Sequence, residues 1–289
     1  MFPIIGLAVV FGMVFGGFVL AGGHFEVIIE AAPMEFMMIF GAAVGATIIS
    51  NDMHGLKQVV GGFGTVMKGP KWGKKDYSDL LALLFQLTKL MKTKGVVALE
   101  QHIEKPNESA IFQKYPKLTK DHFVVDFICD TLRMMTMNLE DPHQVEDAME
   151  KQLEKHHHEH LTGSHAVQNL ADALPALGIV AAVLGIIKTM GSITEPPAVL
   201  GEMIGSALVG TFLGVFLAYG MVGPFATRMK EIVDEEAAFY KIIQSVLVAH
   251  LHGNAAQISV EIGRGDVPSA AQPSFAELEE ALGAMPAEG

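Results

Sequence analysis

Four stretches of the chain are almost entirely apolar, and their lengths suit a membrane. The first, 2–23, holds no charged residue, and the second covers 34–50. The third runs over 173–189 and the fourth over 203–227. Because a helix rises 1.5 Å per residue, about 20 apolar residues cross the ~30 Å hydrocarbon layer. The pattern predicts four transmembrane helices, with Glu35 of the second at the membrane interface.

Apolar residues at helical spacing predict further helices outside these stretches. From Leu80 they follow i, i+3, i+4, i+7 and i+11, which predicts a helix over 77–94 that ends before Gly95. Comparable patterns predict helices over 97–103, 121–138, 142–160 and 228–251. Ser274 and Glu277 have the spacing of a capping box at the start of a short last helix. The expected fold is an all-α integral membrane protein with four transmembrane helices and a large helical cytoplasmic domain.

Positive charge is distributed unevenly enough to predict the orientation. Of the 20 Lys and Arg residues, 19 lie in 51–168 or 227–289, while the links 24–33 and 190–202 contain none. The positive-inside rule therefore predicts that both termini and the long middle segment are cytoplasmic. The expected organisation is transmembrane helices 1 and 2 over 1–50, a cytoplasmic domain over 51–172, transmembrane helices 3 and 4 over 173–227, and a cytoplasmic C-terminal helix and tail over 228–289.

Composition and motifs exclude several classes of function. A net charge of −12 argues against nucleic acid as a partner. The single cysteine, Cys129, excludes an internal disulfide and a Cys-based zinc site. No Walker lysine motif, G-x-S-x-G elbow or zincin motif occurs, so we expect neither an enzyme nor a cofactor. Gly61–Gly64 lacks the preceding strand of a phosphate-binding loop, and we interpret it as a flexible exit from the membrane.

A histidine tract over 156–160 is a candidate metal site. His156 and His160 are four residues apart, a spacing that brings two ligands to one face of a helix. The same residues suit a solvated helix end, and no H-E-x-x-H motif accompanies them. We favour the solvated helix end and expect no metal, with a metal-regulated membrane scaffold as the competing interpretation.

Two prolines flank the second pair of spans. Pro175 stands at the cytoplasmic entry of the third span and Pro224 at the cytoplasmic exit of the fourth. Because the two spans run antiparallel, we expect both prolines at the same depth, where each removes a backbone donor and bends its helix. Such a pair would carry a change in the membrane to the cytoplasmic domain. For Pro175 the alternative is a first-turn proline that only starts a helix.

The fourth span presents two different faces. Thr211, Val215 and Tyr219 form one stripe at a spacing of four, which Leu208 extends. A second stripe holds Gly210, Gly214 and Ala218, and the same small-residue spacing recurs at Gly178 and Ala182, Gly41 and Gly45, and Gly12 and Gly16. Such pairs let helix backbones approach closely in lipid.

Two hypotheses stay open for the hydroxyl of Thr211. It either bonds back to a carbonyl one turn earlier or faces an ion path. No Asp or Glu lies in the middle of a predicted span, although an intramembrane proton carrier is usually such a group. If the protein conducts protons, the titrating carboxylate is expected to come from a partner.

Long segments of the chain resemble the MotA family of flagellar motor stator subunits. The most specific are Leu174–Gly185, Val209–Gly214, Leu217–Gly220 and Pro224–Thr227. Further matches are Val14–Gly17, Asp79–Leu84, Leu99–Glu100, Ile103–Glu104, Val260–Arg264 and Gln272–Phe275. The resemblance covers nearly the whole chain in order. The third and fourth spans are shared with the wider MotA/TolQ/ExbB family, whereas the first pair and the tail are specific to MotA-like proteins.

This resemblance implies a partner and a function. MotA-like proteins form a ring around two MotB-like subunits, whose transmembrane helix carries the ion-binding aspartate. The implied function is a stator subunit of the bacterial inner membrane, which conducts protons with this partner and converts ion flow into torque on the rotor. The resemblance assigns conformational coupling to Pro175 and Pro224. It places four residues toward the partner helix and the ion path: Ala182, Leu208, Thr211 and Tyr219.

The resemblance also implies a contact with the rotor protein FliG. By register the contact residues are Lys92 and Glu100, and Lys94 shares the role. Arginine is usual where Lys92 stands, so this chain keeps the charge and lacks the planar fork of the guanidinium.

Two alternatives to a proton-driven stator remain. Sodium-driven relatives tend to have a threonine where Ala182 stands, beside the one that matches Thr211. A single hydroxyl offers fewer oxygen ligands to a metal cation, and we therefore predict protons. A TolQ- or ExbB-like energiser of an outer-membrane system is the second alternative, and such relatives lack the first pair of spans.

Overall fold

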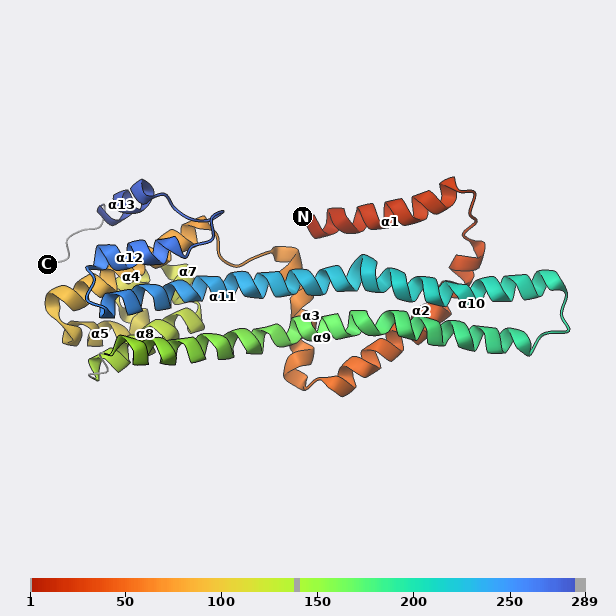
Figure 1. Ribbon diagram of the computed structural model, residues 1–289, viewed down its shortest axis with the longest axis horizontal. Helices are drawn as coiled ribbons and strands as arrows, with labels where there is room; N and C mark the ends of the chain where they lie inside the picture. Colours follow the sequence, from red (N-terminus) through yellow and green to blue (C-terminus); the bar gives the residue numbers. More distant parts are fainter. Residues whose placement is uncertain (1, 138–140, 284–289) are drawn as a thin grey trace. The chain divides into compact units, whose positions relative to one another are not determined.

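The computed structural model describes residues 2–137 and 141–283, and within these ranges every regular element is a helix (Figure 1). The predicted all-α fold is thus confirmed. The chain divides into two compact units, one made of 1–69 with 160–233 and the other of 70–159 with 234–289. We call them the membrane unit and the second unit, and each is described by itself.

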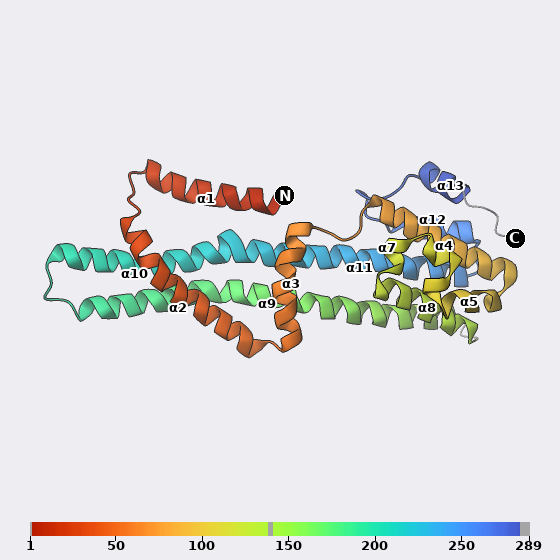
Figure 2. The same cartoon turned by 180° about the vertical axis from the view of Figure 1, so that it is seen from behind.

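The membrane unit contains the four predicted spans. Among the described residues, four helices are long and apolar enough to cross a membrane. They are α1 (Phe2–Leu20), α2 (Glu26–Ser50), α9 (Pro142–Met190) and α10 (Pro197–Leu217), which continues through the π-helical turn η3 (Ala218–Val222) into α11 (Gly223–Leu251). The short helix α3 (Met53–Lys68) follows α2 and also belongs to this unit (Figure 2).

Three helices differ from what the sequence pattern predicted. The helix that contains the second predicted span, 34–50, already begins at Glu26, and its first turns carry the exposed Glu26 and Glu30. The segments 142–160 and 173–189 are parts of one helix of 49 residues, α9. Gly61–Gly64 is no flexible exit but lies inside α3, where Gly62 faces Met229 so closely that a Cβ would fall 2.0 Å from its Cε.

The second unit is a cluster of short helices packed on parts of α9 and α11. In order they are α4 (Lys74–Lys94), η1 (Val96–Leu99), α5 (Glu100–Ile103), η2 (Pro106–Glu108), α6 (Ala110–Gln113), α7 (Pro116–Thr119), α8 (His122–Thr136), α12 (Ala256–Gly265) and α13 (Phe275–Gly283). The predicted helix over 77–94 is confirmed as α4. It ends at Gly95, whose φ of 82° is easily adopted only by a residue without a side chain.

The core of this unit follows the predicted apolar positions. Leu80, Leu83, Leu84 and Leu87 of α4 are fully buried, and they belong to one cluster with Phe239 of α11. The expected helix over 97–103 is split between η1 and α5, and that over 121–138 is α8, whose side-chain cap is Asp121. Asn138 lies outside the described residues. Burial raises the pKa of the Cys129 thiol to about 12, so this cysteine is an inert part of the core.

Candidate functional site

The close contact between α9 and α10 is built from glycines. A Cβ on Gly178 would lie 2.8 Å from the Gly210 carbonyl oxygen, and a Cβ on Gly214 would lie 2.6 Å from that of Leu174. About two turns nearer the end of α9, a Cβ on Gly185 would lie 2.6 Å from the Ala207 Cβ and 3.0 Å from its Cα. Only residues without a side chain permit this backbone approach. The small-residue stripe of α10 therefore determines how the two helices pack.

The other small-residue pairs do not pack within this chain. Apart from the local backbone of the same helix and the neighbouring residues, no atom of the described residues lies within 4 Å of where a Cβ would stand on Gly12, Gly16, Gly41 or Gly45. On α2 the buried stripe consists instead of Ala31, Glu35, Ile39, Ala43 and Thr47. The glycine pairs of α1 and α2 thus leave smooth helix surface uncovered by the chain itself.

The second stripe of the fourth span, which runs from Leu208 on α10 to Tyr219 on η3, is more exposed than the buried glycine stripe. Leu208 is 60% exposed and Tyr219 is 73% exposed, while Thr211 and Ala182 are half-buried. Thr47, Thr189 and Thr227 each donate to the carbonyl four residues earlier, but Thr211 makes no side-chain hydrogen bond with any residue in the described ranges. Its hydroxyl is therefore available to a group outside the chain, which favours the second of the two hypotheses for this residue.

Pro224 follows a break in the regular hydrogen-bond ladder. The preceding turn, η3, is π-helical, and the Gly223 N–H donates to the Ala218 carbonyl oxygen five residues earlier. A cavity of about 450 Å³ lies beside this turn, and Gln168, Tyr219, Pro224 and Arg228 are among its lining residues. Because π-turns and prolines both loosen the ladder, this is a place where the helix can bend.

Pro175 lies in the interior of α9, so the interpretation of a first-turn proline is wrong. The expectation that both prolines share one depth is also wrong. Pro175 is next to Leu174, which faces Gly214, whereas Pro224 shares its cavity with Gln168. Gln168 precedes Pro175 by seven residues of one helix, which is about 10 Å at 1.5 Å per residue. The glycine contacts fix how α9 is aligned along α10 and α11. The positions of the two prolines in the sequence do not reveal this alignment.

Glu35 is a site residue that the sequence analysis placed wrongly. Its side chain is only 6% exposed and faces α10, where a Cβ on Gly210 would come within 2.5 Å of its Oε2. Gly210 in turn packs on Ala181, the midpoint of the predicted span 173–189. The carboxyl is therefore buried between helices rather than at the interface. The signal was present in the sequence, because Glu35 continues the apolar i+4 series of Ala31, Ile39 and Ala43.

The candidate rotor-contact residues lie around the end of α4 in the second unit. Lys92, Lys94 and Glu100 are all exposed. The Lys92 ammonium donates to the carbonyl oxygens of Gly253 and Asn254 at 3.4 and 3.3 Å, so this residue also ties α4 to the turn after α11. Glu100 opens α5 and lines a shallow cavity of about 670 Å³.

The histidine tract packs against neighbours in the same unit. The His156 ring stacks on Phe123 with 3.6 Å between centroids and meets Tyr240 edge-on, and His157 Nε2 lies 3.3 Å from Asp234 Oδ1. In the described ranges no three His, Cys, Asp or Glu side chains converge as metal ligands would. The ring stacking gives His156 a packing role that the interpretation as a solvated helix end did not include.

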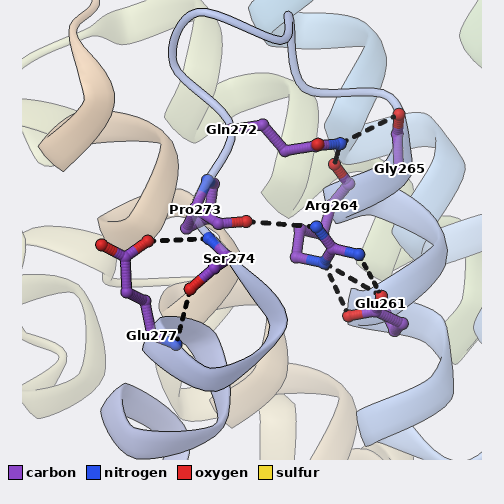
Figure 3. A network of polar contacts seen from close by, with 7 residues as sticks. All are labelled: Glu261, Arg264, Gly265, Gln272, Pro273, Ser274 and Glu277. Atoms are coloured by element: carbon purple, nitrogen blue, oxygen red, sulfur yellow. Dashed lines mark hydrogen bonds and ion pairs between the residues drawn. The ribbon is translucent and has the colours of Figure 1, made fainter.

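A polar network holds the tail of the chain together (Figure 3). The Ser274 N–H donates to Glu277 Oε2 at 2.7 Å and the Glu277 N–H to Ser274 Oγ at 3.2 Å, which confirms the predicted capping box of α13. On α12 the Arg264 guanidinium pairs with Glu261 and donates to the Pro273 carbonyl oxygen at 3.1 Å. The motifs 260–264 and 272–275 thus have a structural role, joining α12 to the start of α13.

Comparisons with known proteins agree on one family. Residues 4–95 match the family described as motility protein A N-terminal, and 119–241 match the MotA/TolQ/ExbB proton channel family. Motility protein A of Salmonella typhimurium is 38% identical over 99% of this chain and 96% of its own length. Chemotaxis protein LafT of Vibrio parahaemolyticus is 36% identical over 96% of this chain and 97% of its own length.

Two solved structures have the same fold. That of C. jejuni MotAB has a TM-score of 0.74 at 18% identity and covers 94% of this chain and 98% of the matched one. That of the flagellar MotAB stator complex from Bacillus subtilis has a TM-score of 0.70 at 23% identity, with coverages of 89% and 92%.

Proposed function

Since this chain belongs to the motility protein A family and is a stator subunit of the flagellar motor, we propose how it carries out that task. It works with a MotB-like subunit, whose transmembrane helix supplies an ion-binding aspartate, and several copies of the chain surround that partner as a ring. The complex lies in the bacterial inner membrane with both termini of this chain cytoplasmic. The single observation that carries the partner assignment is the exposed α10 face with its unbonded Thr211 hydroxyl.

The partner helix packs along that face. Leu208 and Tyr219 offer apolar and aromatic surface, and Thr211 and Ala182 lie between the partner and the glycine contact of α9 with α10. Protons pass from the outer side of the membrane to the partner's aspartate. Along this path the chain offers few oxygen atoms that could bind a cation. One Thr hydroxyl suits a proton better than a sodium ion, which needs several oxygens in its shell.

Each proton delivers only a small amount of energy. One elementary charge moving through 100 mV is worth about 2.3 kcal/mol, so torque needs many coupled steps. We propose that the π-turn before Pro224 and the interior proline Pro175 are the points at which a change beside the partner helix bends α10–α11 and α9. Their offset of about 10 Å means that the two helices bend at successive levels rather than at one.

Charged residues on the second unit transmit force from this chain to the rotor. Lys92, with Lys94, and Glu100 present both signs of charge near the end of α4 and engage oppositely charged groups of the rotor protein FliG. The link from Lys92 to the turn after α11 supports this role, because a force on its ammonium is passed to the helix that continues from α10.

Gene deletion tests the proposed function. Cells without the gene should keep their filaments and stop rotating them, and the restored gene should return rotation in medium with or without sodium. A rotation that requires sodium would favour the sodium-driven alternative. Normal swimming after deletion, with an outer-membrane transport defect instead, would favour the TolQ/ExbB-like alternative, against which the first pair of helices and the N-terminal family match already argue.

A further inference from the structure

One cavity of the membrane unit is not explained by the partner-facing surface. It has a volume of about 520 Å³ and lies between α2, α9 and α10. Its polar lining residues are Glu30, Glu35, Lys188, Thr189, Glu202 and Ser206. These polar residues come from three different helices. The cavity is therefore not a packing defect along a single helix.

Glu35 is the buried group of this cavity. Its Oε2 atom is shielded from solvent and has no hydrogen-bond partner in the part of the chain that the structure describes. The Thr189 hydroxyl, which lines the same cavity, is satisfied because it donates to the Gly185 carbonyl oxygen at 3.0 Å. Nothing in the packing of α2 requires an acid at this position.

Gly210 provides the space for the carboxyl group. A methyl group there would come within 2.5 Å of Oε2 and 3.2 Å of the carboxyl carbon of Glu35. Gly210 is adjacent to Thr211, the hydroxyl assigned to the ion path. The Glu35 carboxyl thus lies beside α10 at Gly210, and the next residue of α10 is the Thr211 of the proposed pathway.

The mouth of the cavity carries more negative than positive charge. Glu30 of α2, Lys188 of α9 and Glu202 of α10 are the other charged residues that line it, and all three are exposed. The links 24–33 and 190–202 also contain no Lys or Arg. A cavity with this balance raises the local concentration of cations.

We propose that this cavity is the entry vestibule for protons and that Glu35 is a proton relay supplied by this chain itself. Ionisable residues inside membrane spans are costly and mark ion pathways. A hydronium ion in the vestibule gives its proton to a Glu35 oxygen, forming a neutral carboxylic acid and water. That acid then loses the proton toward the partner's aspartate, Glu35 becomes a carboxylate again, and no electrons move. This inference rests on the proposed function, because the final acceptor belongs to the partner.

Proton flow through the reconstituted complex tests the proposal. The full chain and its MotB-like partner are placed in liposomes without sodium, and acidification is followed under an applied potassium diffusion potential. Glu35→Gln keeps the shape of the side chain and removes its proton, and it should slow proton flow by about 100-fold, as loss of a positioned acid does. Glu26→Gln, on the same helix but exposed and outside the lining of the cavity, is the matched control and should leave the flow unchanged.

A second measurement does not depend on flow. Infrared difference spectra of the complex between acidic and neutral outer buffer should contain a carboxylic acid carbonyl band that Glu35→Gln lacks and Glu26→Gln retains. If Glu35→Gln does not accumulate in the membrane, Glu35→Asp takes its place. The shorter acid should still conduct, at a lower rate and with a shifted dependence on outer pH.

The possible failures are distinct. If the wild-type complex conducts no protons, the proposed function itself fails. If it conducts and Glu35→Gln conducts equally well, only the relay is refuted. The relay is also refuted if Glu26→Gln abolishes flow as fully as Glu35→Gln, if the infrared band persists without Glu35, or if Glu35→Asp leaves the pH dependence unchanged.

Discussion

A methyl group on Gly214 would separate two helices that now touch through their backbones. Its Cβ would lie 2.6 Å from the Leu174 carbonyl oxygen and 3.0 Å from the Gly178 Cα, and neither atom is the end of a flexible side chain. Ordinary contact begins at 3.4 Å, so α9 and α10 must move apart by about 0.8 Å. We therefore expect Gly214→Ala to weaken the packing beside Pro175 and Thr211.

The size of the effect follows from packing in lipid. Helices in a membrane associate mainly through van der Waals contact, and a gap of 0.5–1 Å forfeits about a quarter to a half of each contact energy. Overpacking of this kind costs about 1–3 kcal/mol, or roughly a 5- to 150-fold change in the folding equilibrium. Alanine has a greater helix propensity than glycine, and this offsets at most about 1 kcal/mol of the overpacking cost.

Thermal unfolding of the detergent-solubilised chain measures this loss. Gly41→Ala is the matched control, because it adds the same methyl group to a helix glycine with open space around it. It should leave the transition unchanged or raise it, whereas Gly214→Ala should lower it, so the two variants differ in sign. Equal stability of the two variants would refute the derived helix contact.

Three further predictions concern the proposed roles and the effect of pH. Pro175→Ala should stop swimming while filaments still assemble, as seen on motility agar and by electron microscopy; full motility would contradict the coupling role. Lys92→Glu or Glu100→Lys should reduce swimming speed, and an opposite reversal on the rotor should partly restore it; the contact is wrong if neither reversal has an effect. Burial lowers the pKa of His250 below 6.5, so the second unit should have its full stability above pH 6.5 and lose part of it as the pH falls through the lowered value. Thermal unfolding at about pH 7.5 and 5.5 should detect this difference, and a His250→Gln variant should lack it.

Much of the fold follows from the order of residues alone. The four apolar stretches predicted four membrane helices, and the i, i+3, i+4 series from Leu80 predicted α4 and its buried face. Local signals at Gly95 and at Ser274 with Glu277 correctly predicted where helices end and begin. These features depend on near neighbours along the chain, so a one-dimensional pattern contains them.

The arrangement of the candidate site depends on contacts that no local pattern contains. Small-residue pairs occur on all four spans, yet those of α1 and α2 meet open space, whereas Gly178, Gly185, Gly210 and Gly214 bring α9 and α10 together. That contact sets the register of two helices, and it decides that Pro175 and Pro224 lie at different levels. Glu35 appears from sequence to be an acid near a membrane surface, and only the gap at Gly210 on another helix makes its burial possible. Hydrophobic length determined which segments cross the membrane, whereas steric fit between their faces decided which chemical groups meet.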